Sequence, residues 1–426
     1  MTARQPRPDL HRSFPQSPDP EGPQGPDVPA RGSPDTLCAR GGAGARDGEP
    51  LVFPIVQSTS FGRDGLESRA EHAYSRVSKP TVGALERALG GLEDAPPAVA
   101  FATGLAAETA LLLATVRAGD HVVCGRAVYG GTTRLLQRLF APLGVETTFV
   151  DATDAGAVAA ALRPATRLVL VETPANPTLV LTDIAAVARA AHAAGALLAV
   201  DNTFLTPVLQ RPLDLGADVA VYSTTKFIEG HSAALGGALV ARDTDLLDRL
   251  RFVRKSTGAI QSPFNAWLTL QGLRTLPLRL RRQSDSARRI AAALARRPEV
   301  ERVHYPTLSG GADAALAERQ HLGAHGAVLS FALRGGAPAA RALLSRVRLC
   351  RLAEHVGSVE TLLTHSASMT HADVPPEERR LAGIDDGLLR LSVGLEDAED
   401  ILRDLLGALE AAPTVRGKEV PCDATP

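Results

Sequence analysis

The chain has 426 residues, of which 45% are hydrophobic and 22% are charged, and its formal net charge is −1. This length allows two domains with sizeable cores, and the near-neutral charge gives no bulk attraction to nucleic acid or to a membrane. The four cysteines, Cys38, Cys124, Cys350 and Cys422, form no CxxC pair, which disfavours a metal site and indicates a reducing, cytoplasmic compartment.

The first 45 residues are dense in Pro, Gly, Asp and Arg and have almost no apolar periodicity. They also lack the apolar core of a secretory signal. Such a segment cannot bury enough apolar surface to offset its ordering entropy, so residues 1–45 are predicted to be a disordered N-terminal tail. Residues 413–426 are predicted to be a second, shorter tail.

From residue 98 onward, short apolar runs alternate with Ala- and Leu-rich helical stretches. Unbroken apolar runs are typical of parallel strands that are covered on both faces, and helices between such strands indicate βαβ units. No run reaches the length of about 18 residues that a membrane span requires. We therefore predict an α/β large domain with a mostly parallel sheet. Its predicted strands are residues 98–102, 121–125, 167–172, 197–201, 218–223 and 237–241.

After residue 277 the pattern changes to Arg/Ala-rich helices and fewer strands. Helices are predicted at 278–297, 313–321, 338–347 and 396–412, and a strand is predicted at 327–333. This pattern predicts a smaller α+β C-terminal domain over residues 278–412.

Ligands of parallel α/β sheets gather at the carboxyl ends of the strands, and these ends carry polar residues here. Gly104 and Leu105 open a helix after the first strand, where their N–H groups could bind a phosphate or could simply begin the helix. Tyr129 lies in a glycine-flanked loop after the second strand and could stack on an aromatic ligand or pack as a core residue. Asn176 follows the third strand in a proline-rich turn.

The next two strand ends carry an acid and a lysine. Asp201 could cap a turn or could neutralise a protonated ring nitrogen. Ser223, Thr225 and Lys226 follow the next strand, and Lys226 is one of only four lysines in a chain whose Lys and Arg total 46. Unlike arginine, a lysine can lose its proton and attack a carbonyl. A phosphate seat, a stacking ring, a carboxylate and an amine at successive strand ends together favour pyridoxal 5'-phosphate (PLP) as the cofactor.

The chain resembles the Cys/Met-metabolism (trans-sulfuration) family of PLP-dependent enzymes, which includes cystathionine γ-synthases, cystathionine γ-lyases, methionine γ-lyases and homoserine sulfhydrylases. The resemblance covers residues 35–411. It rests on the stretches PDTLCARGG, FPIVQSTSF, YSRVSKPTV, TGLAAETA, YGGTTR, ETPANPT, AVDNTF, YSTTKFIEGH and RLSVGLED. It implies PLP fold type I, which is aspartate-aminotransferase-like, with a PLP-binding large domain at 78–277 and an arm at 46–77 that contacts a neighbouring subunit.

The resemblance also implies roles for the residues at the strand ends. Lys226 would bind the cofactor covalently, and Asp201 would keep the ring nitrogen protonated. Tyr129 would stack on the ring and Asn176 would lie near the ring hydroxyl. The phosphate would be bound by Gly104, Leu105, Ser223 and Thr225.

Further residues match positions that contact the substrate or a second subunit in this family. Tyr74 and Arg76 match residues that reach the phosphate of a neighbouring subunit, so a dimer would be the minimum unit and a tetramer of two dimers is expected. Arg390 matches the residue that binds the substrate carboxylate, a task that suits a bidentate guanidinium. Glu360 and Thr361 are predicted to contact the substrate, and Glu360 matches an acid of the γ-acting members.

The resemblance implies γ-elimination or γ-replacement on a sulfur-containing or O-acylated homoserine-type amino acid. Freed Lys226 would remove the Cα proton, and Tyr129 would donate a proton to the leaving group on Cγ. We expect a carbon–sulfur lyase similar to methionine and cystathionine γ-lyases. A transferase of the cystathionine γ-synthase or O-acylhomoserine sulfhydrylase type is the alternative, and a non-catalytic relative or a fold-type-I aminotransferase is more remote. No metal, nucleic-acid or membrane partner is expected.

Several positions depart from the family pattern. Gly131 stands where methionine γ-lyases typically carry Cys, which weighs against methionine as the best substrate. Ala233 stands where many members have Asp, EHVGS at 354–358 replaces the usual SLGG, and the usual His-Pro is His365-Ser366. These changes cluster where the substrate side chain is expected. We therefore predict intact cofactor chemistry and an unusual substrate choice, with a specialised γ-replacement among the options.

Overall fold

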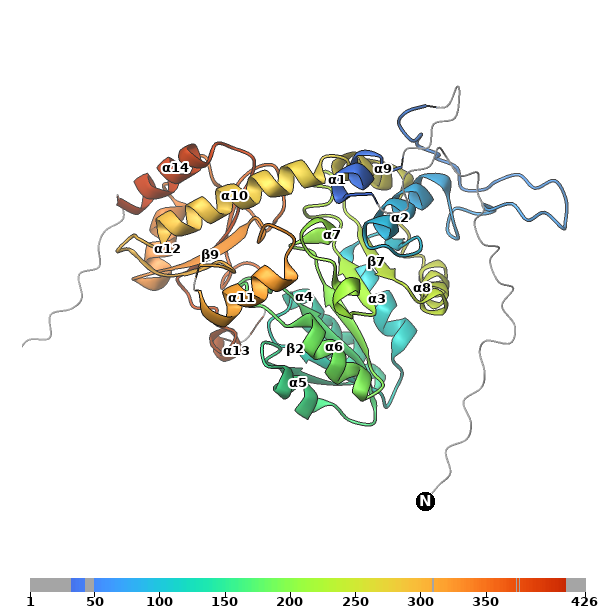
Figure 1. Cartoon of the computed structure of the whole chain (residues 1–426), viewed down its shortest axis with the longest axis horizontal. Helices are drawn as coiled ribbons and strands as arrows, with labels where there is room; N and C mark the ends of the chain where they lie inside the picture. Colours follow the sequence, from blue (N-terminus) through green and yellow to red (C-terminus); the bar gives the residue numbers. More distant parts are fainter. Residues whose placement is uncertain (1–31, 43–49, 309, 373, 375, 411–426) are drawn as a thin grey trace, which may run out of the picture.

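The computed structural model describes residues 32–42, 50–308, 310–372, 374 and 376–410. The predicted tail at 413–426 and residues 1–31 lie outside this part of the chain. Two sheets with their helices make up the fold, and α10 (Leu276–Leu294) extends from the first sheet to the second (Figure 1). None of the helices in these ranges combines the length and the apolar character of a membrane-spanning segment.

The first sheet has seven strands in the order β1-β7-β6-β5-β4-β2-β3. Their bounds are β1 (Val99–Phe101), β2 (His121–Gly125), β3 (Glu146–Val150), β4 (Thr166–Glu172), β5 (Leu197–Asp201), β6 (Val219–Tyr222) and β7 (Gly237–Ala241). The predicted mostly parallel sheet is confirmed, because only β7 runs antiparallel to its neighbours. Strand β3 was not predicted, since it pairs only with β2 at the sheet edge and most of its residues are not buried.

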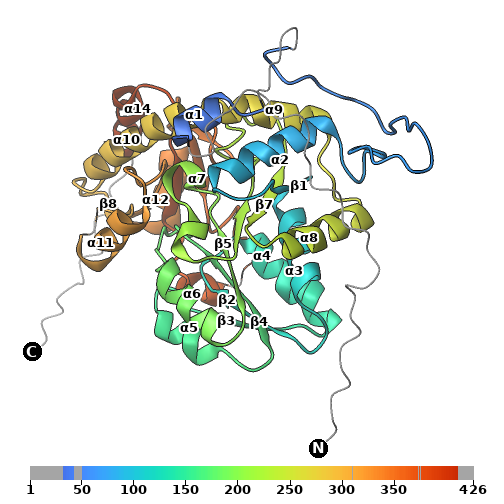
Figure 2. The ribbon, with the colours of Figure 1, turned by 45° about the vertical axis from the view of Figure 1, so that its right-hand side comes forward.

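Helices cover both faces of this sheet, as the unbroken apolar runs predict. In β4, Leu168 and Leu170 face one helical layer, whereas Val169 and Val171 face the other. The first layer contains α3 (Gly104–Thr115), the π-helix η1 (Leu135–Phe140) and α8 (Thr244–Thr257). The second contains α2 (Pro80–Leu92), α5 (Ala155–Ala161), α6 (Ile184–Ala193) and α9 (Pro263–Leu273). Figure 2 shows α3 and α8 on one side of the strands and α5 and α6 on the other.

Local sequence signals set the starts of these helices. Thr103, Asp183, Asp243 and Ser262 each accept a hydrogen bond from a backbone N–H in the first turn of α3, α6, α8 and α9. Each such cap contributes about 1 kcal/mol to helix stability. The remaining short helices of this half are α4 (Gly130–Arg134), η2 (Ala141–Leu143), α7 (Thr206–Leu209) and η3 (Pro212–Leu215).

The second sheet has five strands in the order β10-β11-β12-β9-β8 and is antiparallel except between β10 and β11. Its strands are β8 (Val300–His304), β9 (Val328–Leu333), β10 (Arg351–Leu352), β11 (Leu362–His365) and β12 (Leu388–Ser392). Its helices are α11 (Gly311–Gln320), α12 (Gly336–Leu344), α13 (Pro376–Leu381) and α14 (Ala398–Glu410). Helices α10, α12 and α14 share one apolar core with this sheet. The predicted domain boundary at 277/278 falls inside α10.

The prediction of disorder was wrong for residues 34–39, which form α1 (Pro34–Ala39). Ser33 caps the helix and Pro34 occupies its first turn, which favours a helical start. Cys38 is fully buried in the core that includes α2 and α9, and Asp35 accepts two hydrogen bonds from Arg281, at 2.6 and 2.8 Å. A helix this short is unstable alone, so these tertiary contacts order it.

Residues 50–77 extend away from the body of the chain (Figures 1 and 2). The segment makes one isolated β-bridge, between Ser60 and Tyr74. Phe53 packs against the core that includes α2 and α9, but Leu51, Ile55 and Leu66 are exposed, and Leu66 is 97% exposed. Exposed apolar residues on an extended segment are typical of a surface that another chain covers. The predicted contact between this arm and a neighbouring subunit stays a prediction.

Candidate active site

The carboxyl ends of β4, β5 and β6 lie side by side and carry polar residues. Glu172 and Asp201 are register partners at the ends of β4 and β5, and Ser223 comes directly after β6. Because parallel strands end at the same edge of a sheet, these residues come together without any contribution from a loop.

Among the described residues, Asp201 accepts hydrogen bonds from neutral groups. Its Oδ1 accepts a hydrogen bond of 2.8 Å from the Thr203 N–H, and the Thr203 hydroxyl accepts one of 2.8 Å from the Ser223 N–H. Burial raises the pKa of Asp201 above its ordinary value, and the hydrogen bonds from Thr203 oppose that rise. A cation beside this carboxylate would stabilise its charged form.

Glu172 is a site residue that the sequence analysis did not identify. Its Oε2 accepts a hydrogen bond of 2.6 Å from the Tyr129 N–H, and its Oε1 accepts one of 2.8 Å from the Asn176 N–H. Burial raises the pKa of Glu172 well above its ordinary value, and the neighbouring Asp201 adds to the rise. Glu172 therefore joins two predicted cofactor loops. The sequence feature that could have identified Glu172 is an acidic residue at the end of the otherwise apolar stretch RLVLVE.

Lys226 lies in the turn that follows β6, with its side chain largely buried. Its Nζ lies 3.3 Å from Nδ1 of His355. Burial lowers the pKa of Lys226 to about 8, and the nearby Arg390 adds to this effect. Near neutral pH, a lysine with this pKa has a reactive neutral fraction that an exposed lysine lacks.

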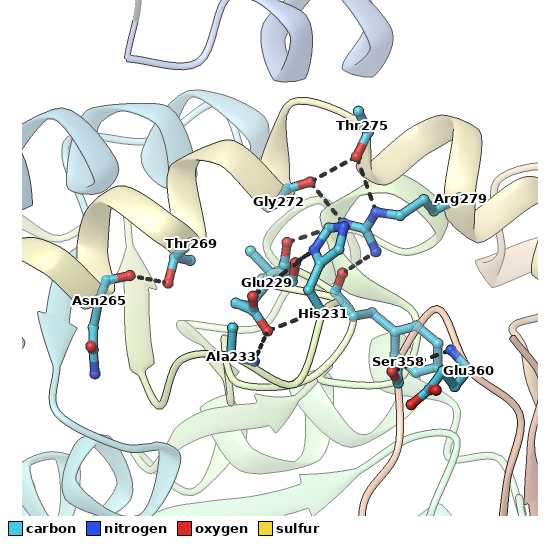
Figure 3. Close-up of polar contacts among 12 residues, drawn as sticks. Glu229, His231, Ala233, Asn265, Thr269, Gly272, Thr275, Arg279, Ser358 and Glu360 are labelled. Atoms are coloured by element: carbon cyan, nitrogen blue, oxygen red, sulfur yellow. Dashed lines mark hydrogen bonds and ion pairs between the residues drawn. The ribbon is translucent and has the colours of Figure 1, made fainter. Parts of the chain in front are cut away.

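The loop after Lys226 is fixed by α10 and by its own acid (Figure 3). The Arg279 guanidinium donates to the carbonyl oxygens of Phe227 and Ile228, at 2.9 and 3.2 Å. Glu229 Oε2 accepts from the N–H groups of His231 and Ala233, at 3.0 and 3.1 Å. The departure from Asp at position 233 is thus accompanied by a carboxylate four residues earlier that binds the same loop.

Arg390 lies on β12 and is almost completely buried. Its guanidinium donates to Oδ1 of Asn176 at 2.7 Å, to the carbonyl oxygen of His355 at 3.0 Å and to Oγ1 of Thr364 at 3.0 Å. These three oxygens are all neutral, and within the described part of the chain Nε of Arg390 has no hydrogen-bond partner. Burial lowers the pKa of Arg390 to about 10. A buried guanidinium with neutral partners and a free donor fits an anionic ligand.

The predicted phosphate residues meet at the start of α3. A Cβ on Gly104 would lie 2.9 Å from the Cβ of Ser223, so only glycine allows the start of the helix to approach this strand end. Gly104 and Leu105 provide the first N–H groups of α3, which favour an anion. The Thr225 hydroxyl is already paired with Gly236, donating to its carbonyl at 3.0 Å and accepting from its N–H at 2.9 Å.

Tyr129 lies at the start of α4, and its side chain is 39% exposed. A Cβ on Gly131 would overlap the Tyr129 ring, so the glycine that replaces Cys here leaves space for this ring position. A Cβ on Gly130 would lie 3.4 Å from the Thr370 carbonyl, which places the loop after β11 beside Tyr129.

Four residues that were predicted to contact the substrate or the phosphate of a neighbouring subunit make other contacts within this chain or lie apart from the strand ends. The Thr361 hydroxyl is buried and donates to Oε2 of Glu396 at 2.7 Å, and Glu360 is exposed with Arg351 at 3.8 Å. The remaining two, Tyr74 and Arg76, lie on the extended arm.

This arrangement fits PLP on three counts. The N–H groups that open α3 suit a phosphate, and the half-buried Asp201 would be stabilised in its charged form by a cationic partner such as a protonated ring nitrogen. The partly buried amine of Lys226, with its lowered pKa, suits covalent binding of an aldehyde. Arg390, which contacts the predicted ring neighbour Asn176, would then face a carboxylate bound beside the cofactor.

Comparisons with known proteins agree with this fit. A sequence profile of the Cys/Met metabolism PLP-dependent enzymes matches residues 35–410. The chain is 40% identical over 371 residues to an L-methionine gamma-lyase of Fusobacterium nucleatum subsp. polymorphum, covering 84% of this chain and 93% of that protein. It is 44% identical over 357 residues to a cystathionine gamma-synthase of Mycobacterium bovis, covering 84% and 91% respectively.

A solved structure gives the same result. The cystathionine gamma synthase of Xanthomonas oryzae pv. oryzae in complex with cystathionine is 43% identical and has a TM-score of 0.87. The match covers 90% of this chain and 99% of that one. The expected PLP fold type I is therefore confirmed.

Proposed function

This chain belongs to the Cys/Met metabolism family of PLP-dependent enzymes, and we propose that it is a carbon–sulfur lyase that catalyses γ-elimination on a sulfur-containing or O-acylated homoserine-type amino acid. One observation carries the proposal. A partly buried amine, on Lys226, and a buried guanidinium, on Arg390, both contact His355, next to strand ends that carry Asp201. These groups suit an amino acid bound through its carboxylate beside a PLP-binding lysine.

We infer that Lys226 binds PLP covalently, that Asp201 pairs with the ring nitrogen and that Tyr129 stacks on the ring. Asn176 would lie near the ring hydroxyl. The residues proposed to bind the phosphate are Gly104, Leu105, Ser223 and Thr225. Bound there, PLP supplies an electron sink for the negative charge that develops when the substrate loses its Cα proton.

Arg390 is proposed to bind the substrate carboxylate. Its hydrogen-bond partners are all neutral oxygens and its Nε has no partner among the described residues, so the guanidinium still has a donor for a carboxylate. The same guanidinium contacts Asn176 and the carbonyl of His355, which fixes its position. The carboxylate would therefore be oriented relative to Lys226 before any proton moves.

Lys226 is proposed to remove the Cα proton. With a pKa of about 8, the amine is neutral in roughly a tenth of molecules at pH 7, against a negligible fraction for an unshifted lysine. The hydroxyl of Tyr129 is proposed to donate a proton to the leaving group on Cγ. Glu172 supports this step by binding the backbone N–H of Tyr129.

A γ-replacement of the cystathionine γ-synthase or O-acylhomoserine sulfhydrylase type is the second candidate. Relatives named cystathionine gamma-synthase are as similar to this chain as the lyases are. The two outcomes differ in whether water or a sulfur nucleophile reaches the site after the leaving group departs. The departure at 354–358 includes His355, which contacts both Lys226 and Arg390 and therefore lies where this access would be decided.

We also propose a homo-oligomer, a tetramer of two dimers, in the cytoplasm. Arg76 lies over the ring of Tyr74, 5.3 Å from the centroid, and donates to the carbonyl of Lys255 at 2.9 Å. The extended arm that carries Tyr74 and Arg76 exposes apolar residues, which supports contact with the phosphate site of a neighbouring subunit. A cytoplasmic location is supported by the scattered cysteines.

The first test is an absorption spectrum of the purified protein after incubation with PLP, followed by product analysis. We expect a cofactor band that is lost in Lys226→Ala and kept in the matched control Lys255→Ala. Elimination on methionine or cystathionine releases 2-oxobutanoate, whereas replacement on an O-acylhomoserine with a thiol yields a new thioether. The absence of a band would contradict the cofactor site. A band without either product would contradict γ chemistry.

A further inference from the structure

His355 lies between the two groups on which the proposed reaction depends. Its Nδ1 is 3.3 Å from Nζ of Lys226, and its carbonyl oxygen accepts a hydrogen bond of 3.0 Å from Nη2 of Arg390. We propose that His355 is a positioning residue whose imidazole accepts a hydrogen bond from the Lys226 amine and orients that amine while it exchanges a proton with the substrate. This inference rests on the proposed function of the site.

The loop that carries His355 is fixed against the backbone of Lys226. Gly357 has a φ of +87°, and a Cβ there would lie 2.5 Å from the Phe227 nitrogen and 2.8 Å from the Lys226 carbonyl carbon. The Gly357 N–H donates to Oγ of Ser392 at 2.8 Å. Because the loop is held at this close approach, the imidazole stays beside the amine.

The protonation states of the pair follow from this contact. Burial, followed by the charges of Lys226 and Arg390, lowers the pKa of His355 to about 4, so the imidazole is neutral near pH 7. An ammonium can only donate, so Nδ1 must accept and the imidazole proton lies on Nε2. When Lys226 takes the Cα proton, the resulting ammonium donates one of its three N–H groups to Nδ1. No proton leaves the imidazole in this step.

The charges around Lys226 indicate how the neutral imidazole of His355 affects the protonation of the Lys226 amine. Arg390, from β12, disfavours the ammonium form of Lys226. The carboxylates of Glu172, from β4, and Glu354, next to His355 in the sequence, raise the pKa of Arg390. The imidazole stabilises the ammonium of Lys226 through a hydrogen bond without adding a positive charge. Its loss is expected to lower the pKa of Lys226 further and to leave the amine without a fixed direction.

Three variants test the proposal. His355→Leu removes the acceptor but fills the volume, and His355→Asn retains an oxygen acceptor near the Nδ1 position. His304→Leu is the control, because His304 is another partly buried histidine whose pKa is lowered to about 4, and it contacts Arg302 at 3.0 Å. The measurement uses the PLP-loaded full chain in D2O and follows exchange of the Cα hydrogen of L-alanine by NMR across pH. L-alanine has no γ leaving group, so exchange reports the Lys226 step alone. Binding of L-alanine is measured in parallel from the cofactor absorbance.

His355→Leu is expected to slow exchange by about 10- to 30-fold, the effect of one hydrogen bond at a reacting group. It should also move the rising limb of the pH profile to lower pH and change the apparent Kd of L-alanine by less than about 3-fold. His355→Asn should recover most of the rate.

The proposal would be overturned if His355→Leu exchanged the Cα hydrogen of L-alanine at the wild-type rate and the rising limb of its pH profile did not move. Equal losses of exchange and binding in the Leu and Asn variants would also overturn it, because His355 would then only pack the loop. If the wild-type chain neither binds PLP nor changes its absorbance with amino acids, the proposed function itself fails, and this is visible before any variant is compared.

Discussion

On the cofactor side of the site, Glu172 and Asp201 project from neighbouring strands in register, whereas on the substrate side His355 and Arg390 come from a loop and a strand of the second sheet. The cofactor residues need only the sheet to come together. The substrate residues reach Lys226 because the loop at 354–358 packs against the turn after β6. A strand end fixes where a side chain lies whatever surrounds it, but a loop position depends on tertiary contacts. The two sides are therefore expected to respond differently to substitution.

The largest effect is expected at Arg390, on the substrate side. Arg390→Lys should lower kcat/KM by about 10²- to 10³-fold, because an ammonium cannot form two parallel hydrogen bonds with a carboxylate. The absorbance of bound PLP should be unchanged. The control, Arg302→Lys, alters a half-exposed pair with Asp385 and should leave kcat/KM within about 2-fold. Loss of cofactor binding in Arg390→Lys would show that the two sides are not separable.

Gly357 holds the substrate-side loop against the backbone of Lys226 and Phe227. Gly357→Ala should lower the free energy of unfolding by about 2–3 kcal/mol, because the residue has a φ of +87° and its Cβ would lie 2.5 Å from the Phe227 nitrogen. Gly323→Ala is the matched control, with a φ of +79° and nothing within 4 Å, and it should cost only about 1 kcal/mol. Denaturant unfolding of both variants measures the difference. Equal losses would mean that the close approach of the loop contributes nothing.

Glu172 contributes to both sides through the Tyr129 and Asn176 N–H groups. Glu172→Gln should lower kcat/KM by about 10- to 100-fold, because the new NH₂ group faces one of these donors and displaces its loop. Circular dichroism of the bound cofactor should change with it. Glu146→Gln, at the exposed edge of the sheet, provides the control. An effect on kcat/KM without a change in the cofactor signal would assign Glu172 to the substrate side alone.

The smallest effect is expected at Glu108, a buried residue of α3 whose carboxyl interacts with Asp201. Its Oε2 accepts from the Thr132 hydroxyl at 2.8 Å, and burial, with a contribution from Asp201, raises its pKa to about 8. In the unfolded chain this carboxyl ionises near 4.5, so the free energy of unfolding falls as the pH rises from about 4.5 to 8. Glu108→Gln cannot ionise and should reduce the loss between pH 6 and pH 7 by about 1–2 kcal/mol, measured by urea unfolding. KM should not move. Identical pH dependence in both proteins would contradict this account.

The cofactor side was accessible to sequence analysis because its signals are local. Each predicted strand of the first sheet exists, Asp201 ends β5, and Lys226 lies in the turn after β6, as expected. Strand direction was not accessible, since β7 reads as an apolar run like the parallel strands but is antiparallel. Glu172 was missed because its role depends on two backbone N–H groups from separate loops.

The substrate side was less accessible because its signals are tertiary. Of the second sheet, only β9 was predicted, since β10 has two residues and β8 is exposed at two of its five positions. Thr361 was expected to contact the substrate, but its hydroxyl binds Glu396, a partner 35 residues away in the sequence. The position of His355 depends on how closely Gly357 approaches Phe227, and no pattern in the chain encodes that distance.

Helix α10 binds both sides of the site through main-chain oxygens. Arg279 donates to the carbonyls of Phe227 and Ile228, and Gln283, one turn later on the same face, donates to the carbonyls of Ser358 and Val393 at 2.8 and 2.9 Å. Every amino acid carries such a carbonyl. Side chains at positions 354 and 356, on either side of His355, can therefore be exchanged while the anchors of the loop persist, which makes these two positions a natural target for a directed-evolution library that seeks new leaving groups on an unchanged scaffold.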